Sequence, residues 1–248
     1  MLINEVVLKE DVAETKDLMA IANYVSRWML SEINREEHDG EELQIIDIQD
    51  ITKQKIPDIK TQTVKWLLLK PIPERTKSPL RFVTHLPKNT FDGERGSYFP
   101  APYHSININL DYILKKKGNP ASTLLHELQH ALDDLKSSGK NMKDYSQPEV
   151  DYKQYLKHPT EINARFSQAL WDLATNYETV ARSDVYKAIK TNLAQHRLSN
   201  VEVENPKEYK RLITRAYKFL ADVSQIIDKK EKTGFIQTVK NLIKKWMI

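Results

Sequence analysis

Apolar residues recur every three or four positions along several stretches of the chain, which is the period of an amphipathic α-helix. In residues 11–31 this repeat runs through Leu18, Ile21, Val25 and Met29, and it predicts one long helix. The same spacing predicts further helices over residues 120–137, 159–177, 183–196, 206–229 and 234–247.

A different pattern, the alternation of apolar and polar residues, predicts a strand over Tyr103–Leu110. The run Ile106-Asn107-Ile108-Asn109-Leu110 has the period of two that is typical of a half-buried strand. Together with the helices, it indicates an α+β protein. Elsewhere we expect strands over residues 65–70 and 80–86, a strand or a helix over 43–51, and a loop over 139–157.

The most specific chemical feature of the chain is the sequence His126-Glu127-Leu128-Gln129-His130. Residues four apart on a helix lie one turn apart on the same face. Both imidazoles can therefore bind one zinc ion. Glu127 lies beside them and can accept a proton from a water that the metal activates. The alternative is an amphipathic helix that carries two surface histidines and binds no metal.

The residues around this motif indicate that it lies in the middle of a helix. Asn119 is a favourable N-cap and Pro120 a favourable first helical residue. Gly139 follows the expected end, as glycine often does. We therefore expect a rigid geometry for the motif.

A catalytic zinc usually has three protein ligands and one position open to water. Glu161 is the best candidate for the third ligand, because it lies in the first turn of the helix expected over 159–177, where the helix dipole favours an anion. It could instead pair with Arg165 one turn later. His158 is the rival third ligand. Weaker candidates are His85, His104 and His196.

Other polar residues near the motif could assist the chemistry. Asp134 lies four residues after His130, on the same face, and could orient an imidazole by accepting its second N–H; Asp133 is the alternative. Both could equally be exposed acids near the helix end. Peptide hydrolysis also needs a hydrogen-bond donor for the developing oxyanion. Candidates for this donor, unless they serve only in packing, are Tyr152, Tyr155 and His158.

The composition is that of a soluble globular protein. Hydrophobic residues make up 40% and charged residues 29% of the 248 positions, which excludes a disordered chain. The lack of cysteine excludes disulfides and Cys-rich zinc sites, so any metal must be held by His, Glu or Asp. The first residues do not resemble a signal peptide, and no apolar run could span a bilayer. We therefore expect a cytoplasmic location.

Positive charge is concentrated towards the C-terminus. Residues 184–248 contain 14 Lys and Arg and seven Asp and Glu. Such a basic region could bind nucleic acid. Solvated helix faces are the simpler explanation.

The sequence H-E-L-Q-H-A-L-D-D from His126 to Asp134, followed by Glu161 on a later helix, resembles the gluzincins, the thermolysin-like branch of zinc peptidases. In that family two His and a downstream Glu hold zinc, and the Glu of the motif is the general base. The resemblance implies these roles for His126, His130, Glu161 and Glu127. The stretch H-P-T-E-I-N-A-R over residues 158–165 is similar to an element of HExxH domains in bacteriophage and mobile-element proteins.

Two departures from the gluzincin pattern concern the third ligand. The gap between His130 and Glu161 is longer than in thermolysin. Arg165 stands four residues after Glu161, where thermolysin-like enzymes have an Asp that orients a ligand. In peptidases of this kind an edge strand pairs with the extended substrate. The segment Tyr103–Leu110 is expected to be that strand or an ordinary core strand.

The resemblance covers roughly residues 98–175. We expect a zincin-like α+β domain over residues 1–182, followed by a helical C-terminal region over 183–248 that packs on it. The zincin-like core would hold a small mixed sheet with an edge strand, the HExxH helix over 120–137 and the Glu helix over 159–177. The expected function is a zinc-dependent metalloendopeptidase that hydrolyses polypeptides and is encoded by a phage.

Two alternative functions stay open. One is a catalytically silent zincin-fold protein with a structural or assembly role, such as a virion component. The other is a nucleic-acid-binding protein that uses the basic C-terminal helices. Expected partners are a polypeptide substrate and phage or virion proteins, and a phage protein could also be virion-associated rather than cytoplasmic.

Overall fold

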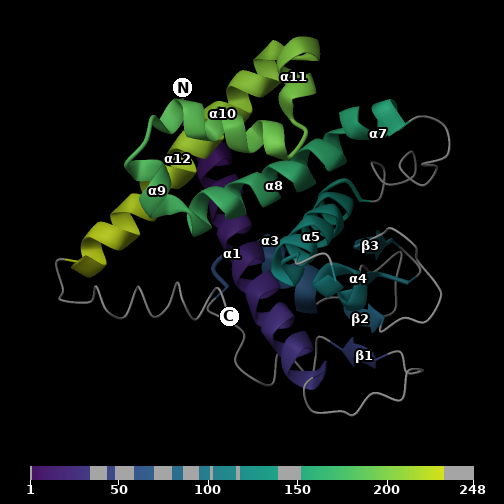
Figure 1. The fold of residues 1–248 in the computed structure, drawn as a ribbon. Coiled ribbons are helices and arrows are strands. Elements are labelled where there is room, and N and C mark those ends of the chain that lie inside the picture. The colour runs from purple at the N-terminus through teal and green to yellow at the C-terminus, as the bar shows by residue number, and fades with distance from the viewer. Residues whose placement is uncertain are drawn as a thin grey trace. The chain divides into compact units, whose positions relative to one another are not determined.

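The computed structural model describes residues 2–33, 44–47, 59–69, 80–85, 95–100, 103–115, 118–138 and 152–231. These residues form a helix-rich α+β structure with one mixed sheet (Figure 1), which confirms the expected class. The helices are α1 (Leu2–Ile33), α3 (Gln62–Leu69), α4 (Leu110–Lys115), α5 (Pro120–Lys136), α7 (Tyr152–Lys157), α8 (Pro159–Thr175), α9 (Tyr177–Ala181), α10 (Val185–Gln195), α11 (Ser199–Glu204) and α12 (Pro206–Glu231).

Contacts between residues group the chain into two compact units. Residues 13–164 form one, here called the sheet unit, and residues 1–12 with 165–248 form the other, the helical unit. Helices α1 and α8 each begin in one unit and continue in the other. The expected division into domains over 1–182 and 183–248 stays a prediction, because grouping by contacts does not test independent folding.

The sheet has the strand order β1-β2-β4-β3, with β1 at Gln44–Asp47, β2 at Arg81–His85, β4 at Ser105–Asn109 and β3 at Gly96–Phe99. Strand β2 runs parallel to β4, and the other two pairings are antiparallel. Strand β4 therefore lies inside the sheet, with four of its five residues buried. The edge position expected for this segment was wrong, because the unforeseen strand β3 pairs with its other side. The alternative expectation for this segment, an ordinary core strand, is confirmed.

Residues 62–69 form helix α3, so the strand expected over 65–70 was wrong. The carboxylate of Asp17, on α1, accepts hydrogen bonds from the N–H groups of Lys60 (3.0 Å) and Thr61 (2.7 Å), just before the helix starts. A short apolar run fits a strand or a helix equally well. Here the carboxylate of Asp17, which is distant in the sequence, satisfies backbone N–H groups at the start of the helix. Buried side chains at helical spacing are Val64, Leu67 and Leu68.

Helix α5 packs against strands β3 and β4 and against helices α3 and α4 (Figure 1). Near its end, Lys136 forms an ion pair with the buried carboxylate of Glu14 on α1. These contacts fix the helix on several sides, so its central residues are held in place by the core. Its fully buried apolar residues include Leu124, Leu125, Leu128 and Ala131.

In the helical unit, α12 packs against α10 and α11. The buried side chains of this unit include Leu193, Leu212 and Phe219. The helices expected over residues 183–196 and 206–229 are confirmed within two residues at each end. The short helices α4, α9 and α11 were not predicted, and α7 forms in a segment expected to be a loop. The helix expected over 234–247 lies outside the described residues.

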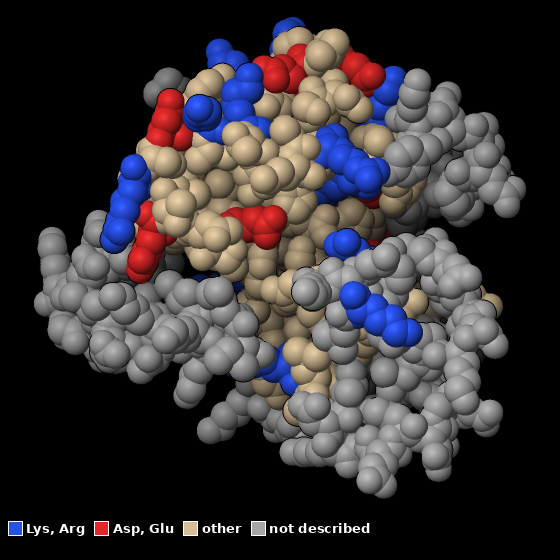
Figure 2. All heavy atoms as spheres, in the orientation of Figure 1, with Lys and Arg blue, Asp and Glu red and all other residues tan. Residues whose placement is uncertain are grey.

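The described surface carries both signs of charge. Figure 2 shows Lys and Arg interspersed with Asp and Glu on the face in view. Arg211 of α12 pairs with Glu208 at 3.5 Å, and Lys190 pairs with Glu202 at 2.7 Å. Nucleic-acid binding by the basic C-terminal region, residues 184–248, stays a prediction.

Within the described ranges, no helix combines the length and the apolar character that crossing a membrane requires.

Candidate metal centre

Helix α5 begins as its sequence predicts. The side-chain oxygen of Asn119 accepts a hydrogen bond from the N–H of Ala121 at 2.9 Å, and Pro120 is the first helical residue. The helix continues to Lys136. His126, Glu127 and His130 are therefore at mid-helix, where the backbone geometry is rigid.

Three side chains converge between α5 and the first turn of α8. The Nε2 atoms of His126 and His130 lie 3.1 Å apart, and each lies 3.5 Å from Oε2 of Glu161. Glu161 is fully buried, and the side chain of His126 keeps 13% of its surface exposed. Among the described residues, these three form the group that lies close enough to hold a metal ion.

Burial keeps one of the two imidazoles neutral. The pKa of His130 is lowered from its ordinary value of 6.5 to about 4, chiefly because burial removes the hydration of the charged ring. The hydrogen bond with Glu161 opposes this shift, and the charge of His126 adds to it. At neutral pH the ring therefore has a lone pair available for a cation, as a metal ligand must.

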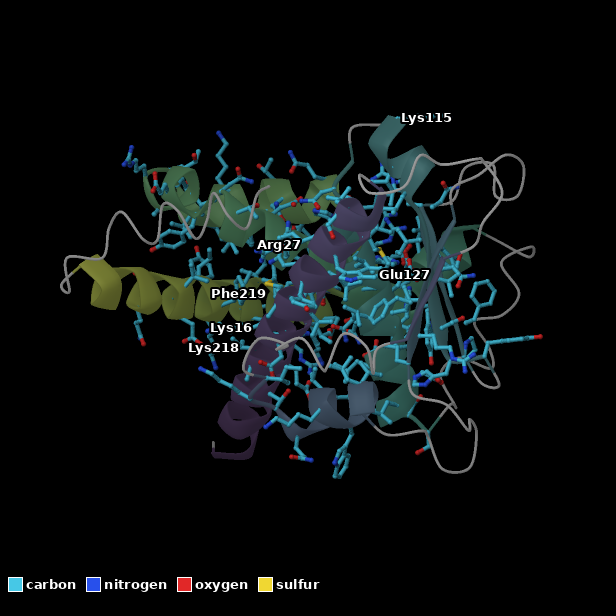
Figure 3. The ribbon with its side chains drawn as sticks, turned by 90° about the horizontal axis from the view of Figure 1, so that it is seen from below. Lys16, Arg27, Lys115, Glu127, Lys218 and Phe219 are labelled. Atoms are coloured by element: carbon cyan, nitrogen blue, oxygen red, sulfur yellow. The ribbon has the colours of Figure 1, made fainter. Side chains whose placement is uncertain are left out.

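Glu127 lies next to this cluster and is 5% exposed; Figure 3 shows it within the body of the sheet unit. Two residues on its face of α5 contact strand β3. Thr123 lies so close to Gly96 that a Cβ on the glycine would come within 2.9 Å of its methyl group, and Asp134 bonds to Tyr98. Residues 123, 127 and 134 share one side of a helix. Glu127 therefore faces the side on which β3 runs.

Asp133 joins the two helices of the cluster. Its Oδ2 accepts a hydrogen bond from the amide of Asn163 on α8 at 3.0 Å. Its Oδ1 accepts one from Gln129 on α5 at 2.9 Å. Asp133 is 8% exposed, so its bond to Gln129 is buried, whereas its bond to Asn163 is partly buried. Asp133, the alternative to Asp134 in the sequence analysis, thus contacts helix α8, which carries Glu161.

Asp134 is fully buried, and its Oδ2 accepts a hydrogen bond from the hydroxyl of Tyr98 at 2.8 Å. This bond ties α5 to strand β3. The alternative of an exposed acid near the helix end was wrong. The expected hydrogen bond from Asp134 to an imidazole stays a prediction.

The rival ligand His158 lies in the turn between α7 and α8. Its Nδ1 is hydrogen-bonded to the hydroxyl of Thr160 at 2.7 Å, and the described group that lies close enough to hold a metal ion includes Glu161 instead. The backbone N–H of His158 donates a hydrogen bond to the backbone carbonyl of Tyr155 at 3.1 Å. An oxyanion role for Tyr155 or His158 stays a prediction, and the side chain of Tyr152 lies outside the described residues.

The weaker histidine candidates have other surroundings. His104 is fully buried and packs edge-on against Tyr98, with 6.1 Å between ring centroids. His196 belongs to the helical unit, where its Nε2 lies 2.7 Å from Oδ2 of Asp172. The side chain of His85 lies outside the described residues.

Sequence reasoning missed three residues that support the site. Gln129 occupies an unspecified position of the motif, Asn163 looks like any polar residue of a helix, and Tyr98 lies on the strand that was not predicted. Each acts through a partner on another segment or on the next helical turn. The helical spacing of Gln129 and Asp133 was the one available signal.

Comparisons of the chain with protein-family models, with curated proteins and with solved structures gave no match. The residues and their geometry therefore carry the functional argument by themselves.

Proposed function

We propose that this chain is a zinc-dependent metallopeptidase with a zincin-like core. The observation that carries the proposal is the cluster of His126, His130 and Glu161, with Glu127 adjacent to the first ligand on the same rigid helix. The resemblance to gluzincins implies the same four roles.

The separations of the three ligand atoms suit a zinc ion. Zinc binds imidazole nitrogen at about 2.0–2.1 Å and carboxylate oxygen at about 2.0–2.2 Å in tetrahedral geometry. Such bonds place any two ligand atoms about 3.3–3.6 Å apart. The separations of 3.1, 3.5 and 3.5 Å agree with this within a few tenths of an ångström. Iron(II) also accepts two imidazoles and a carboxylate, but the carboxylate of Glu127 favours a hydrolytic site.

Each residue of the site has a distinct chemical task. Zinc held by His126, His130 and Glu161 would act as a Lewis acid that activates a water molecule and polarises a peptide carbonyl. The carboxylate of Glu127 would accept the proton from that water and pass it to the leaving amine. Because Glu127 is almost fully buried, little bulk water competes for this proton.

Strand β3 supports a polypeptide as the substrate. The N–H of Asn109 donates to the carbonyl of Arg95 at 2.9 Å, so the pairs 95–109 and 97–107 are the hydrogen-bonded ones of this antiparallel ladder. The backbone groups of Gly96 therefore point away from β4, towards the outer side of the sheet. An extended peptide could add there, beside the face of α5 that carries Glu127.

Metal analysis and a proteolysis assay test this function. We expect purified protein to contain one zinc per chain and to cleave an unfolded polypeptide. Glu127→Gln should keep the zinc, because it removes no ligand, and should lose roughly 10²–10⁴-fold in rate. Glu178→Gln on the exposed surface of α9 is the matched control.

Four outcomes of this experiment are informative. Protein without zinc, or full activity in Glu127→Gln, would contradict the proposal. Iron in place of zinc would point to a different reaction class. Zinc without any cleavage would favour the catalytically silent zincin-fold protein. The low exposure of His126, His130 and Glu161 also agrees with that alternative.

A further inference from the structure

The ligands of the candidate centre come from two separate helices, whose spacing has to be set by contacts outside the cluster. His126 and His130 share α5, so the helix itself fixes their separation. Glu161 lies on α8, 31 positions after His130 in the sequence. A metal site tolerates errors of only about 0.2 Å in its bond lengths. The distance between α5 and the first turn of α8 therefore decides whether Glu161 can complete the site.

The Asp133–Asn163 hydrogen bond lies where it can set this distance. Asn163 is two residues after Glu161 on α8, and Asp133 is three residues after His130 on α5. Their side chains meet at 3.0 Å. A bond to a charged acceptor is stronger than one between neutral groups, and the low exposure of Asp133 keeps this acceptor largely out of water.

Gln129 directs the carboxylate towards α8. Its amide donates to Oδ1 of Asp133 at 2.9 Å along the helix, which leaves Oδ2 for Asn163. The two bonds together restrict the rotation of the carboxylate. Glu161, Asn163 and Asp133 therefore form one mechanically connected group.

We propose that Asp133 and Asn163 are positioning residues that hold Glu161 at coordinating distance from His126 and His130. This inference rests on the zinc binding proposed above. It concerns the affinity for the metal, and neither residue contacts the metal or the substrate in this role. The chemistry at Glu127 is a separate property of the site.

The test measures zinc affinity by competition with a chromophoric chelator, on metal-free protein that is verified as folded by circular dichroism. Asn163→Ala should weaken zinc binding about 10- to 100-fold, as loss of a ligand-orienting partner typically does. Thr61→Val is the matched control. It removes the 2.7 Å hydrogen bond to Asp17, which lies in the same unit and involves neither α5 nor α8, and it should leave the affinity unchanged.

A charge exchange separates geometry from electrostatics. Asn163→Asp adds a negative charge near the cluster, which by Coulomb attraction alone would strengthen cation binding. We instead expect weaker zinc binding, because two carboxylates would then repel each other between α5 and α8. The double variant Asp133→Asn with Asn163→Asp restores an amide–carboxylate pair in reverse, and it should recover most of the affinity.

The outcomes distinguish failure of this inference from failure of the proposed function. Wild-type protein that binds no zinc would contradict the proposed function itself. Wild-type protein that binds zinc, with the same affinity in folded Asn163→Ala, would overturn the positioning role alone. Stronger binding in Asn163→Asp, or no recovery in the double variant, would overturn it as well.

Discussion

At the scale of single residues, burial determines the chemistry of the candidate centre. Glu161 is fully buried, and removing a carboxylate from water is costly unless a positive charge offsets the loss. The adjacent His130 is neutral at pH 7, because its pKa is lowered to about 4 by burial. A bound divalent cation would supply the positive charge. The same burial thus keeps His130 in the neutral form that could bind the proposed metal.

The first prediction concerns the third ligand. Glu161→Ala should reduce zinc affinity more than about 100-fold, since the loss exceeds that of an orienting partner. His158→Ala should change the affinity far less, because His158 bonds to Thr160 and lies outside the three-residue cluster. Chelator competition on both variants measures the difference. The reverse order would assign the third ligand to His158.

At the scale of secondary structure, the fit between α5 and β3 fixes the site relative to the sheet edge. Gly96 lies close to α5, because a Cβ there would come within 2.9 Å of the methyl group of Thr123, and within 3.0 Å of the carbonyl oxygen of Asn107 on β4. At the other end of β3, Tyr98 bonds to Asp134. The strand is therefore held against the helix at two positions.

The second prediction follows from this close approach. Gly96→Ala should destabilise the protein by about 1–3 kcal/mol, the usual cost of overpacking a core, and thermal unfolding should show a lower midpoint. Adding Thr123→Ser removes the methyl group that is nearest to the new Cβ. It should recover part of the loss. Equal stability of Gly96→Ala and wild type would mean that β3 is not packed so tightly.

At the scale of the whole molecule, every residue proposed for the site lies in the sheet unit, residues 13–164. This holds for the three ligands, for Glu127, and for Asp133 and Asn163. The helical unit has a core of its own, which includes the fully buried Leu212. The affinity for zinc should therefore depend on the packing of one unit more than on that of the other.

The third prediction compares matched core substitutions in the two units. Leu212→Ala and Leu128→Ala each remove a fully buried leucine and should each cost about 2–5 kcal/mol. Leu128→Ala should also weaken zinc binding, because Leu128 lies within the motif. Leu212→Ala should leave zinc affinity unchanged. A large loss of affinity in Leu212→Ala would show that the site depends on residues 165–248.

The sequence by itself determined the features that arise within one segment. The period of apolar residues, the Asn119 cap and the four-residue spacing of His126 and His130 are local, because a helix bonds each residue to one only four positions away. Helix α5 and the start of α8 were predictable for this reason. So were the longer helices of the C-terminal region and the strand character of β2 and β4.

Only the tertiary structure decided the features that join distant segments. The run at residues 62–69 became a helix, which Asp17 on α1 supports, and β4 became an inner strand because β3 pairs with it. The proximity of Glu161 to the histidines and the bond between Asp133 and Asn163 are of the same kind. Periodicity specifies which face of an element is apolar, but the partner of each face and the distance between elements follow from packing the whole core.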